Sequence, residues 1–297
     1  MLTVEHLAEL LHNYGEAAGA QVKEFEVGGR FLAFNSRPAI MGVVNLSADS
    51  WYRESVCLTA ERAIQRGRVL REQGADIVDL GAESSLAHAA RVEEAGQTAR
   101  LLPIIRELRA ANVPVSVETY QLAVARACLE AGANVLNLTG TEGSAEMYRM
   151  AAARGAAVII CYVQGPNVRE VGDFTLGADP IGPSRDYFAR QIELAAKNGV
   201  EKILLDPGLG FYYPNLQDSA VRVRYQMRVF LNTFRLRALG FPVCHALPHA
   251  FEHFGEEVRC AEPFFAVLAR LGKTDLFRTH EVPRIKAVLD TLAIYGP

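Results

Sequence analysis

Short apolar segments alternate with longer amphipathic segments along almost the whole chain, and no other feature constrains the fold as strongly. Eight segments have the β-branched and aliphatic composition of buried strands, at residues 39–44, 76–80, 113–118, 133–138, 156–162, 202–206, 241–245 and 275–279. Amphipathic helical segments separate many of them, at residues 59–73, 92–111, 120–131, 186–198 and 216–238. Strands and helices in regular alternation predict a parallel sheet, and eight such strands predict an α/β protein built as a (β/α)8 TIM barrel.

The junctions between helices and strands repeat one local pattern. In "REQGADIVDL", "LEAGANVLNL" and "AARGAAVIIC" a glycine follows the helix and leads directly into an apolar strand, which is a usual stop signal of a helix. The repetition favours a barrel of equivalent units over the alternative fold, an open doubly wound sheet. We expect residues 39–297 to form the barrel and residues 1–38 an N-terminal extension. Within that extension "FEVGGRFLAF" predicts a small β-hairpin that covers the bottom of the barrel.

Charge and cysteine content argue against several classes of partner. A net charge of −3 in 297 residues, 50% of them hydrophobic, gives no indication of binding to nucleic acid or to a membrane surface. Five cysteines without a CxxC pair favour free thiols in a reducing compartment over a disulfide framework. The N-terminal residues lack the basic start and apolar run of a signal peptide, and no apolar segment is long enough to span a bilayer. We therefore expect a soluble, cytoplasmic protein whose ligands are small molecules.

Polar residues follow the predicted strands, at the end where a barrel places its chemistry. Because acidic and amide side chains are costly in an apolar core, such residues predict a ligand pocket. They are Asn45, Asp79, Glu83, Glu118, Asn137, Asp206, His245, His249, Arg278 and His280.

The residue types divide this pocket into two parts. The Asp206 carboxylate, in "LLDPGLGF", together with Asn137 and Glu118, suits a ligand that presents a row of N–H donors. Arg278 and His280 follow the last strand and predict an anion site, because barrels often bind phosphate there. The alternative is a structural ion pair between Glu118 and Arg278 that closes the rim of the barrel.

The segment "PVCHALPHAFEH" places three histidines at intervals of four residues after a cysteine. Histidines at i and i+4 share a face only in a helix, and Pro248 argues against a helix through this segment. We therefore interpret it as the seventh strand and the loop that follows. A metal site formed by Cys244, His245, His249 and His253 is the alternative hypothesis.

Six segments, in order and at successive strand ends, resemble those of dihydropteroate synthases and the broader family of pterin-binding barrel enzymes. The segments are "IMGVVNLSADSW", "DIVDLGAESS", "VPVSVETYQ", "NVLNLTG", "ILLDPGLGF" and "LFRTHEV". The resemblance extends over residues 38–295. It implies a transferase of the folate-biosynthesis type, which condenses a dihydropterin diphosphate with an arylamine and uses Mg²⁺.

The resemblance assigns pterin contacts by position. It implies that Asp206 and Asn137 bind the aminopyrimidine edge of the pterin, with Glu118 where the family usually has Asp. His249 stands where the family has a lysine that contacts the pterin, because "LPHAF" replaces the family's "SRKSF". Lysine carries a fixed positive charge, whereas histidine titrates near neutrality and also binds metals.

The resemblance also assigns the leaving group. It implies that Asn45, Arg278 and His280 hold the diphosphate, and that Asn45 contacts the Mg²⁺ bound to it. In the family's reaction the diphosphate leaves a methylene carbon and the amine attacks, so that no side-chain nucleophile is required and no catalytic residue is assigned.

Two further departures from the family's pattern bear on the substrate. Leu86 stands where an arginine that contacts diphosphate is expected, and Leu138 where the family usually has Asp. Without that arginine and the lysine, we expect a charged diphosphate substrate to bind less tightly than in the family. Because the altered loops make room for a bulkier nucleophile, we predict an arylamine other than plain 4-aminobenzoate, for example the ribofuranosyl aminobenzene phosphate of methanopterin-type pathways. The alternatives are a pterin- or folate-dependent methyltransferase and a non-catalytic pterin-binding homologue. By the same resemblance we expect a homodimer that forms through the last two helices.

Overall fold

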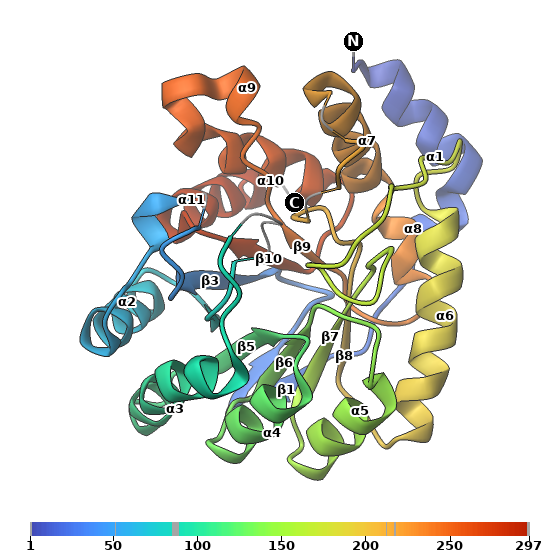
Figure 1. The fold of residues 1–297 in the computed structure, drawn as a ribbon. Helices are drawn as coiled ribbons and strands as arrows, with labels where there is room; N and C mark the ends of the chain where they lie inside the picture. Colours follow the sequence, from blue (N-terminus) through green and yellow to red (C-terminus); the bar gives the residue numbers. More distant parts are fainter. Residues whose placement is uncertain (1, 51, 85–88, 212, 217, 296–297) are drawn as a thin grey trace.

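The computed structural model describes residues 2–50, 52–84, 89–211, 213–216 and 218–295. Its centre is a parallel sheet of eight strands in the order β8-β7-β6-β5-β4-β3-β10-β9. A parallel bridge between Leu205 and Val243 joins β8 to β9, so the sheet closes on itself as a (β/α)8 barrel surrounded by helices (Figure 1). The strands are β3 (Ala39–Asn45), β4 (Ile77–Gly81), β5 (Val115–Thr119), β6 (Val135–Leu138), β7 (Ala157–Cys161), β8 (Ile203–Asp206), β9 (Cys244–Ala246) and β10 (Leu276–Thr279).

All eight strands overlap the predicted segments, which confirms the barrel and excludes the open doubly wound sheet. The largest difference is at β9, which begins at Cys244 although the apolar segment begins at residue 241. Pro242 has no N–H to donate to a ladder, and the Val243 N–H donates to the buried Asp275 carboxylate at 2.8 Å. The ladder of β9 with β10 therefore begins at Cys244.

Helices connect the successive strands and cover the outside of the barrel (Figure 1). The helix predicted over residues 216–238 is divided at Thr233, whose N–H bonds to the carbonyl of Phe230, three residues back. The helices that surround the barrel are α2 (Ala60–Glu72), α3 (Glu94–Ala110), α4 (Leu122–Glu130), α5 (Ser144–Ala153), α6 (Gly182–Lys197), α7 (Ser219–Asn232), α8 (Phe234–Arg237), α9 (Phe251–Phe254), α10 (Ala261–Leu271) and α11 (Val282–Ala293), with 3-10 turns at Arg53–Ser55 and Gly255–Cys260.

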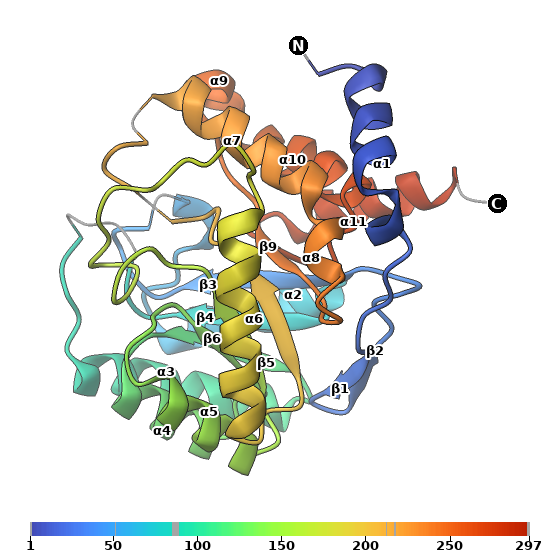
Figure 2. The same ribbon diagram turned by 90° about the vertical axis from the view of Figure 1, so that its right-hand side faces the viewer.

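The N-terminal residues form a helix and the predicted hairpin. Helix α1 (Val4–Ala18) packs on α8, where the Arg235 guanidinium lies 3.9 Å from the centre of the Tyr14 ring. Strands β1 (Phe25–Val27) and β2 (Arg30–Leu32) pair antiparallel. Their apolar side chains belong to one cluster with residues of the barrel interior. The hairpin therefore closes the barrel on the side opposite the long loops that follow β4 and β7 (Figure 2).

Side chains along the strands alternate between two apolar clusters, as the two-residue period of a strand requires. Met41, Ile77 and Val135 point into the barrel interior, whereas Ile40 and Val78 pack against the surrounding helices. The side chains at interior positions become polar where the strands end. This alternation places the strand-end residues named above, apart from His245, at the mouth of the barrel or in the loops that surround it.

Among the described residues, no helix combines the length and the apolar character that crossing a lipid bilayer would require.

Candidate functional site

A cavity of about 440 Å³ opens at the carboxyl ends of the strands. All seven residues predicted to contact substrate line it: Asn45, Glu118, Asn137, Asp206, His249, Arg278 and His280. Apolar and aromatic side chains form part of its wall, among them Leu209, Phe211, Tyr213, Leu216 and Phe251. A concave site with an apolar wall and a few convergent polar groups is the usual form of a small-molecule site.

Asp206 lies at the deep end of this cavity, at the last position of β8. Its Oδ1 accepts the N–H of Gly208 at 2.8 Å. Gly208 has φ +75, and a Cβ atom there would lie 2.4 Å from the carbonyl oxygen of Tyr162, so that only glycine permits this turn. Burial raises the pKa of Asp206 to about 6, although the Gly208 N–H and the Arg278 guanidinium oppose the rise.

Arg278 links two carboxylates across the barrel interior. Its Nε donates to Asp79 Oδ2 at 2.7 Å and its Nη2 to Glu118 Oε2 at 2.5 Å. Asn137 Nδ2 donates to the same Asp79 oxygen at 3.3 Å. The rim ion pair expected as an alternative is therefore present, and Arg278 still lines the cavity. Burial raises the pKa of the Glu118 carboxyl, which Arg278 opposes.

Asn45 ends β3, and its Nδ2 donates to the hydroxyls of Ser50 at 2.8 Å and Ser55 at 2.7 Å. These bonds orient the amide. A Cβ atom on Gly81 would lie 3.8 Å from Asn45 Oδ1 and 3.6 Å from Glu118 Oε2, so both oxygens flank the same glycine. Amide and carboxylate oxygens are the ligands that Mg²⁺ prefers, and the residues present fit the magnesium that the resemblance implies.

Two histidines meet a buried glutamate near the end of β10, the strand that pairs with β3. Glu262 Oε1 accepts from His280 Nδ1 at 2.7 Å and lies 3.3 Å from His249 Nε2. The side chain of Glu262 is fully buried in the first turn of α10. Burial by itself would raise the pKa of Glu262, but His280 and His249 outweigh it and hold this pKa below its ordinary value. Burial lowers the pKa of His280.

Tyr52, in the loop after β3, packs on both histidines. Its ring stacks on that of His280 with centroids 4.6 Å apart and lies 5.1 Å from that of His249. The hydroxyl donates to Glu281, which also accepts from Arg259 Nε at 2.5 Å. Burial and the Glu281 carboxylate raise the pKa of Tyr52. The ring is thus held at both ends and supports the imidazoles.

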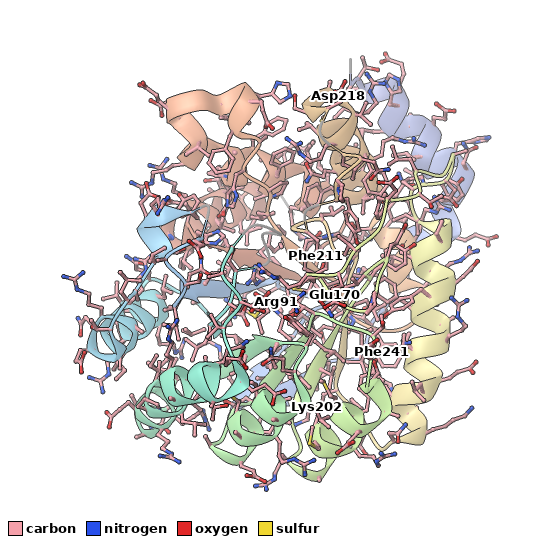
Figure 3. The ribbon with its side chains drawn as sticks, viewed as in Figure 1. Arg91, Glu170, Lys202, Phe211, Asp218 and Phe241 are labelled. Atoms are coloured by element: carbon pink, nitrogen blue, oxygen red, sulfur yellow. The ribbon has the colours of Figure 1, made fainter. Side chains whose placement is uncertain are left out.

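Loops from β4 and β7 cover the other rim. The Glu83 carboxylate accepts from the Tyr120 hydroxyl at 2.7 Å and from the Val92 N–H at 2.9 Å. Arg91 and Glu170 pair across these loops at 3.0 Å (Figure 3). Leu86, expected at the position of a diphosphate-binding arginine, lies outside the described residues.

The metal site proposed for the histidine-rich segment is wrong. Cys244 points into the barrel interior, so His245, the next residue of β9, points outward to the helices. There His245 Nε2 bonds to the Thr233 hydroxyl at 2.8 Å, and burial lowers its pKa to about 3. His253 is exposed on α9. Of the four residues only His249 lines the cavity.

Sequence reasoning missed Glu262, because this residue follows no predicted strand and lies in the mainly apolar segment "AEPFFAVLARLG". A signal was present. Glu262 precedes Phe265, Ala266 and Ala269 at intervals of three, four and seven residues, so it belongs to the buried face of the helix. A carboxylate on such a face requires partners, and the nearest strand end carries His280.

Comparisons with known proteins agree with this geometry. The family model described as "Pterin binding enzyme" matches residues 41–240. A dihydropteroate synthase of Synechocystis sp. is 31% identical over 221 residues, which cover 73% of each chain. The dihydropteroate synthase of Thermus thermophilus, solved with 4-aminobenzoate, superimposes with a TM-score of 0.76 at 26% identity and covers 92% of this chain and 100% of that one.

A dihydropteroate synthase of Xanthomonas albilineans, solved with 7,8-dihydropteroate, superimposes with a TM-score of 0.72 at 26% identity and covers 92% of this chain and 99% of that one. The matched family segment spans β3 to α8 and therefore contains Asn45, Glu118, Asn137 and Asp206. This chain belongs to the pterin-binding enzyme family.

Proposed function

We propose that this protein is a transferase that condenses a dihydropterin carrying a diphosphate leaving group with an arylamine. One observation carries the proposal. A single cavity is lined by the buried acceptors Asn137 and Asp206, by the Arg278 guanidinium and by the imidazoles of His249 and His280. The relatives support it, since solved homologues hold 4-aminobenzoate and 7,8-dihydropteroate, the latter being a pterin joined to that amine.

The reaction exchanges one bond for another. The C–O bond between the pterin methylene carbon and the diphosphate breaks, and the electron pair leaves with the diphosphate. The lone pair of the arylamine nitrogen forms the new C–N bond, and the ammonium proton is lost to solvent. When bound, Mg²⁺ supplies positive charge to the departing oxygens.

The residues of the chain act by binding and orienting the electrophile. Asp206, with Oδ1 held by Gly208, presents Oδ2 to the N–H donors of the pterin ring. Asn137 is fixed by Asp79 on one side and by the Cys161 thiol, which donates to Asn137 Oδ1 at 3.4 Å. Positioning of this kind accounts for much of the rate gained in reactions without a protein nucleophile.

We further propose that the preferred amine is larger than 4-aminobenzoate. The support is the loop after β9, where the sequence resemblance places His249 at the position of the family's lysine, and the aromatic and aliphatic wall of the cavity, which includes Phe211 and Phe251. An aniline with a bulky para substituent suits such a wall.

The test is turnover with 6-hydroxymethyl-7,8-dihydropterin diphosphate, Mg²⁺ and a panel of anilines, with release of diphosphate as the readout. Asp206→Asn removes the acceptor charge, and Asp186→Asn, at an exposed position on α6, is the matched control. We expect turnover in the wild type and the control, and loss of pterin binding with Asp206→Asn. Pterin binding without diphosphate release would indicate a non-catalytic homologue, and methyl transfer from a methylated pterin would indicate a methyltransferase.

We also propose that the protein forms a homodimer through α10 and α11. Phe264 and Leu271 on α10, and Ile294 and Tyr295 after α11, expose large apolar surface. Covering such a surface stabilises association. Light scattering of the wild type and of Phe264→Glu tests this, since a monomeric wild type would contradict the proposal.

A further inference from the structure

The cluster of His249, Glu262 and His280 has the composition of a metal site. Its three donor atoms, His249 Nε2, Glu262 Oε1 and His280 Nδ1, are separated by 3.3 Å, 3.3 Å and 2.7 Å. Among the described residues, this cluster is the one group of three or more His, Cys, Asp or Glu side chains whose ligand atoms all lie within 4.8 Å of one another. The cluster is built by three separate segments: the loop after β9, the first turn of α10 and the end of β10.

The glutamate is oriented by bonds that leave one oxygen for a ligand. Glu262 Oε2 accepts from the Thr279 hydroxyl and from the His280 and Glu281 N–H groups, at 3.0 Å and 3.3 Å for the two amides. The His280 N–H also lies 3.3 Å from Oε1, and the two imidazoles face this oxygen. Supporting bonds of this kind fix the ligands of metal sites. The Tyr52 ring adds a second constraint because it stacks on His280.

A buried carboxylate requires a compensating positive charge. Within the described residues, the ion-pair partners of Glu262 are the two histidines, and no lysine or arginine pairs with it. A divalent ion would satisfy the carboxylate and both ring nitrogens at once.

The spacing suits zinc. A tetrahedral Zn²⁺ ion with bonds of about 2.0–2.1 Å separates its ligand atoms by about 3.4 Å. Two of the three separations are 3.3 Å, and the third, 2.7 Å, needs to open by less than 1 Å. We propose that His249, Glu262 and His280 bind a divalent transition metal, with Zn²⁺ the best match. Two imidazoles and one carboxylate are a ligand set that leaves the fourth position of a catalytic zinc site open.

The open position faces the cavity, since His249 and His280 both line it. The lining also contains the carboxylates of Glu83, Glu118, Asp206 and Glu252, against the two guanidinium groups of Arg222 and Arg278. Both arginines are already paired with carboxylates.

A divalent ion held by two neutral imidazoles and one carboxylate carries a net charge of +1. It therefore supplies the cavity with positive charge for an anionic ligand. We assign its open position to an oxygen of the diphosphate; this role rests on the proposed function, whereas the metal site itself does not.

The first experiment measures zinc binding alone. The full chain is stripped with a chelator and titrated with Zn²⁺ by calorimetry, and bound zinc is counted by mass spectrometry after desalting. We expect one equivalent per chain and a loss of affinity of roughly 100-fold or more in His249→Ala and in His280→Ala. His253→Ala, at an exposed histidine on α9, is the matched control, and circular dichroism checks that each variant folds.

Cysteine must be excluded as the source of the binding. Cys260 is partly exposed and lies two residues before Glu262 in the sequence, so Cys260→Ser is titrated in parallel and is expected to bind as the wild type does. Zinc that is bound equally by the wild type and by His249→Ala, or that is lost only in Cys260→Ser, would overturn the proposal. Absence of zinc binding together with normal turnover would overturn the metal site and leave the proposed function standing.

The second experiment tests the open position. Co²⁺ in place of Zn²⁺ gives visible absorption whose intensity separates four-coordinate from six-coordinate sites, and inorganic pyrophosphate is then added. A four-coordinate spectrum that changes on addition of pyrophosphate, in the wild type and in His253→Ala, supports the assigned role. A spectrum that does not respond to pyrophosphate overturns that role but not the metal site.

Discussion

Replacing Asp206 with asparagine is expected to stabilise the fold while it abolishes pterin binding. Burial raises the pKa of this carboxyl from 3.8 to about 6. A carboxyl whose pKa is higher in the folded protein binds its proton more tightly when folded, so its contribution to stability falls as the pH rises between these two values. Above pH 7 the ionised carboxylate costs the fold about 3 kcal/mol, from a difference of about 2 pH units at about 1.4 kcal/mol each.

Asparagine preserves the geometry, because its amide oxygen can accept the same N–H from Gly208 that Asp206 Oδ1 accepts at 2.8 Å. We expect urea titrations to give the variant a free energy of unfolding about 3 kcal/mol above that of the wild type at pH 8, and about half that difference at pH 5. Asp186→Asn, on the exposed face of α6, is expected to change stability little at either pH.

A difference that does not depend on pH would refute this reasoning. So would a variant less stable than the wild type at pH 8, because both results would mean that the neighbours of Asp206 already compensate its charge. The expected result would identify a residue kept for ligand binding at a cost in stability, as is common in functional sites.

Three further changes test how the site is built. Gly208→Ala forces a Cβ atom to 2.4 Å from the Tyr162 carbonyl oxygen. It should destabilise the fold by about 2 kcal/mol or more, measured by thermal unfolding, and weaken pterin binding, measured by fluorescence titration. Unchanged stability would contradict the steric conflict at this turn. Arg278→Met leaves the buried Asp79 carboxylate and the partly buried Glu118 carboxylate without their cation, and should cost about 3–5 kcal/mol in urea unfolding. A neutral effect would mean that the carboxylates take up protons instead. Tyr52→Phe removes the hydrogen bond to buried Glu281 and should cost about 1–3 kcal/mol, with no loss if water replaces the hydroxyl.

The strand-end residues could be predicted together because they obey one local rule. Asp79 follows Ile77, Asn137 follows Val135 and Arg278 follows Leu276, each two residues after an interior position. A two-residue period and parallel strands are enough to bring such side chains to one mouth. By the same period His245, next to the interior residue Cys244, points outward. Applied to the histidine-rich segment, this rule would have excluded a metal site that includes both Cys244 and His245.

The amino-acid sequence by itself determined the barrel, the hairpin that closes it and the set of polar residues at its mouth, because these depend on local periodicity and on which strand ends carry charge. Only the tertiary structure decided the partners. Arg278 joins Asp79 and Glu118, and Glu262 meets His249 and His280, across separations of 13 to 199 residues. Such pairings depend on where closure of the barrel brings the loops and on which buried charges must neutralise one another, and neither is encoded in any single segment.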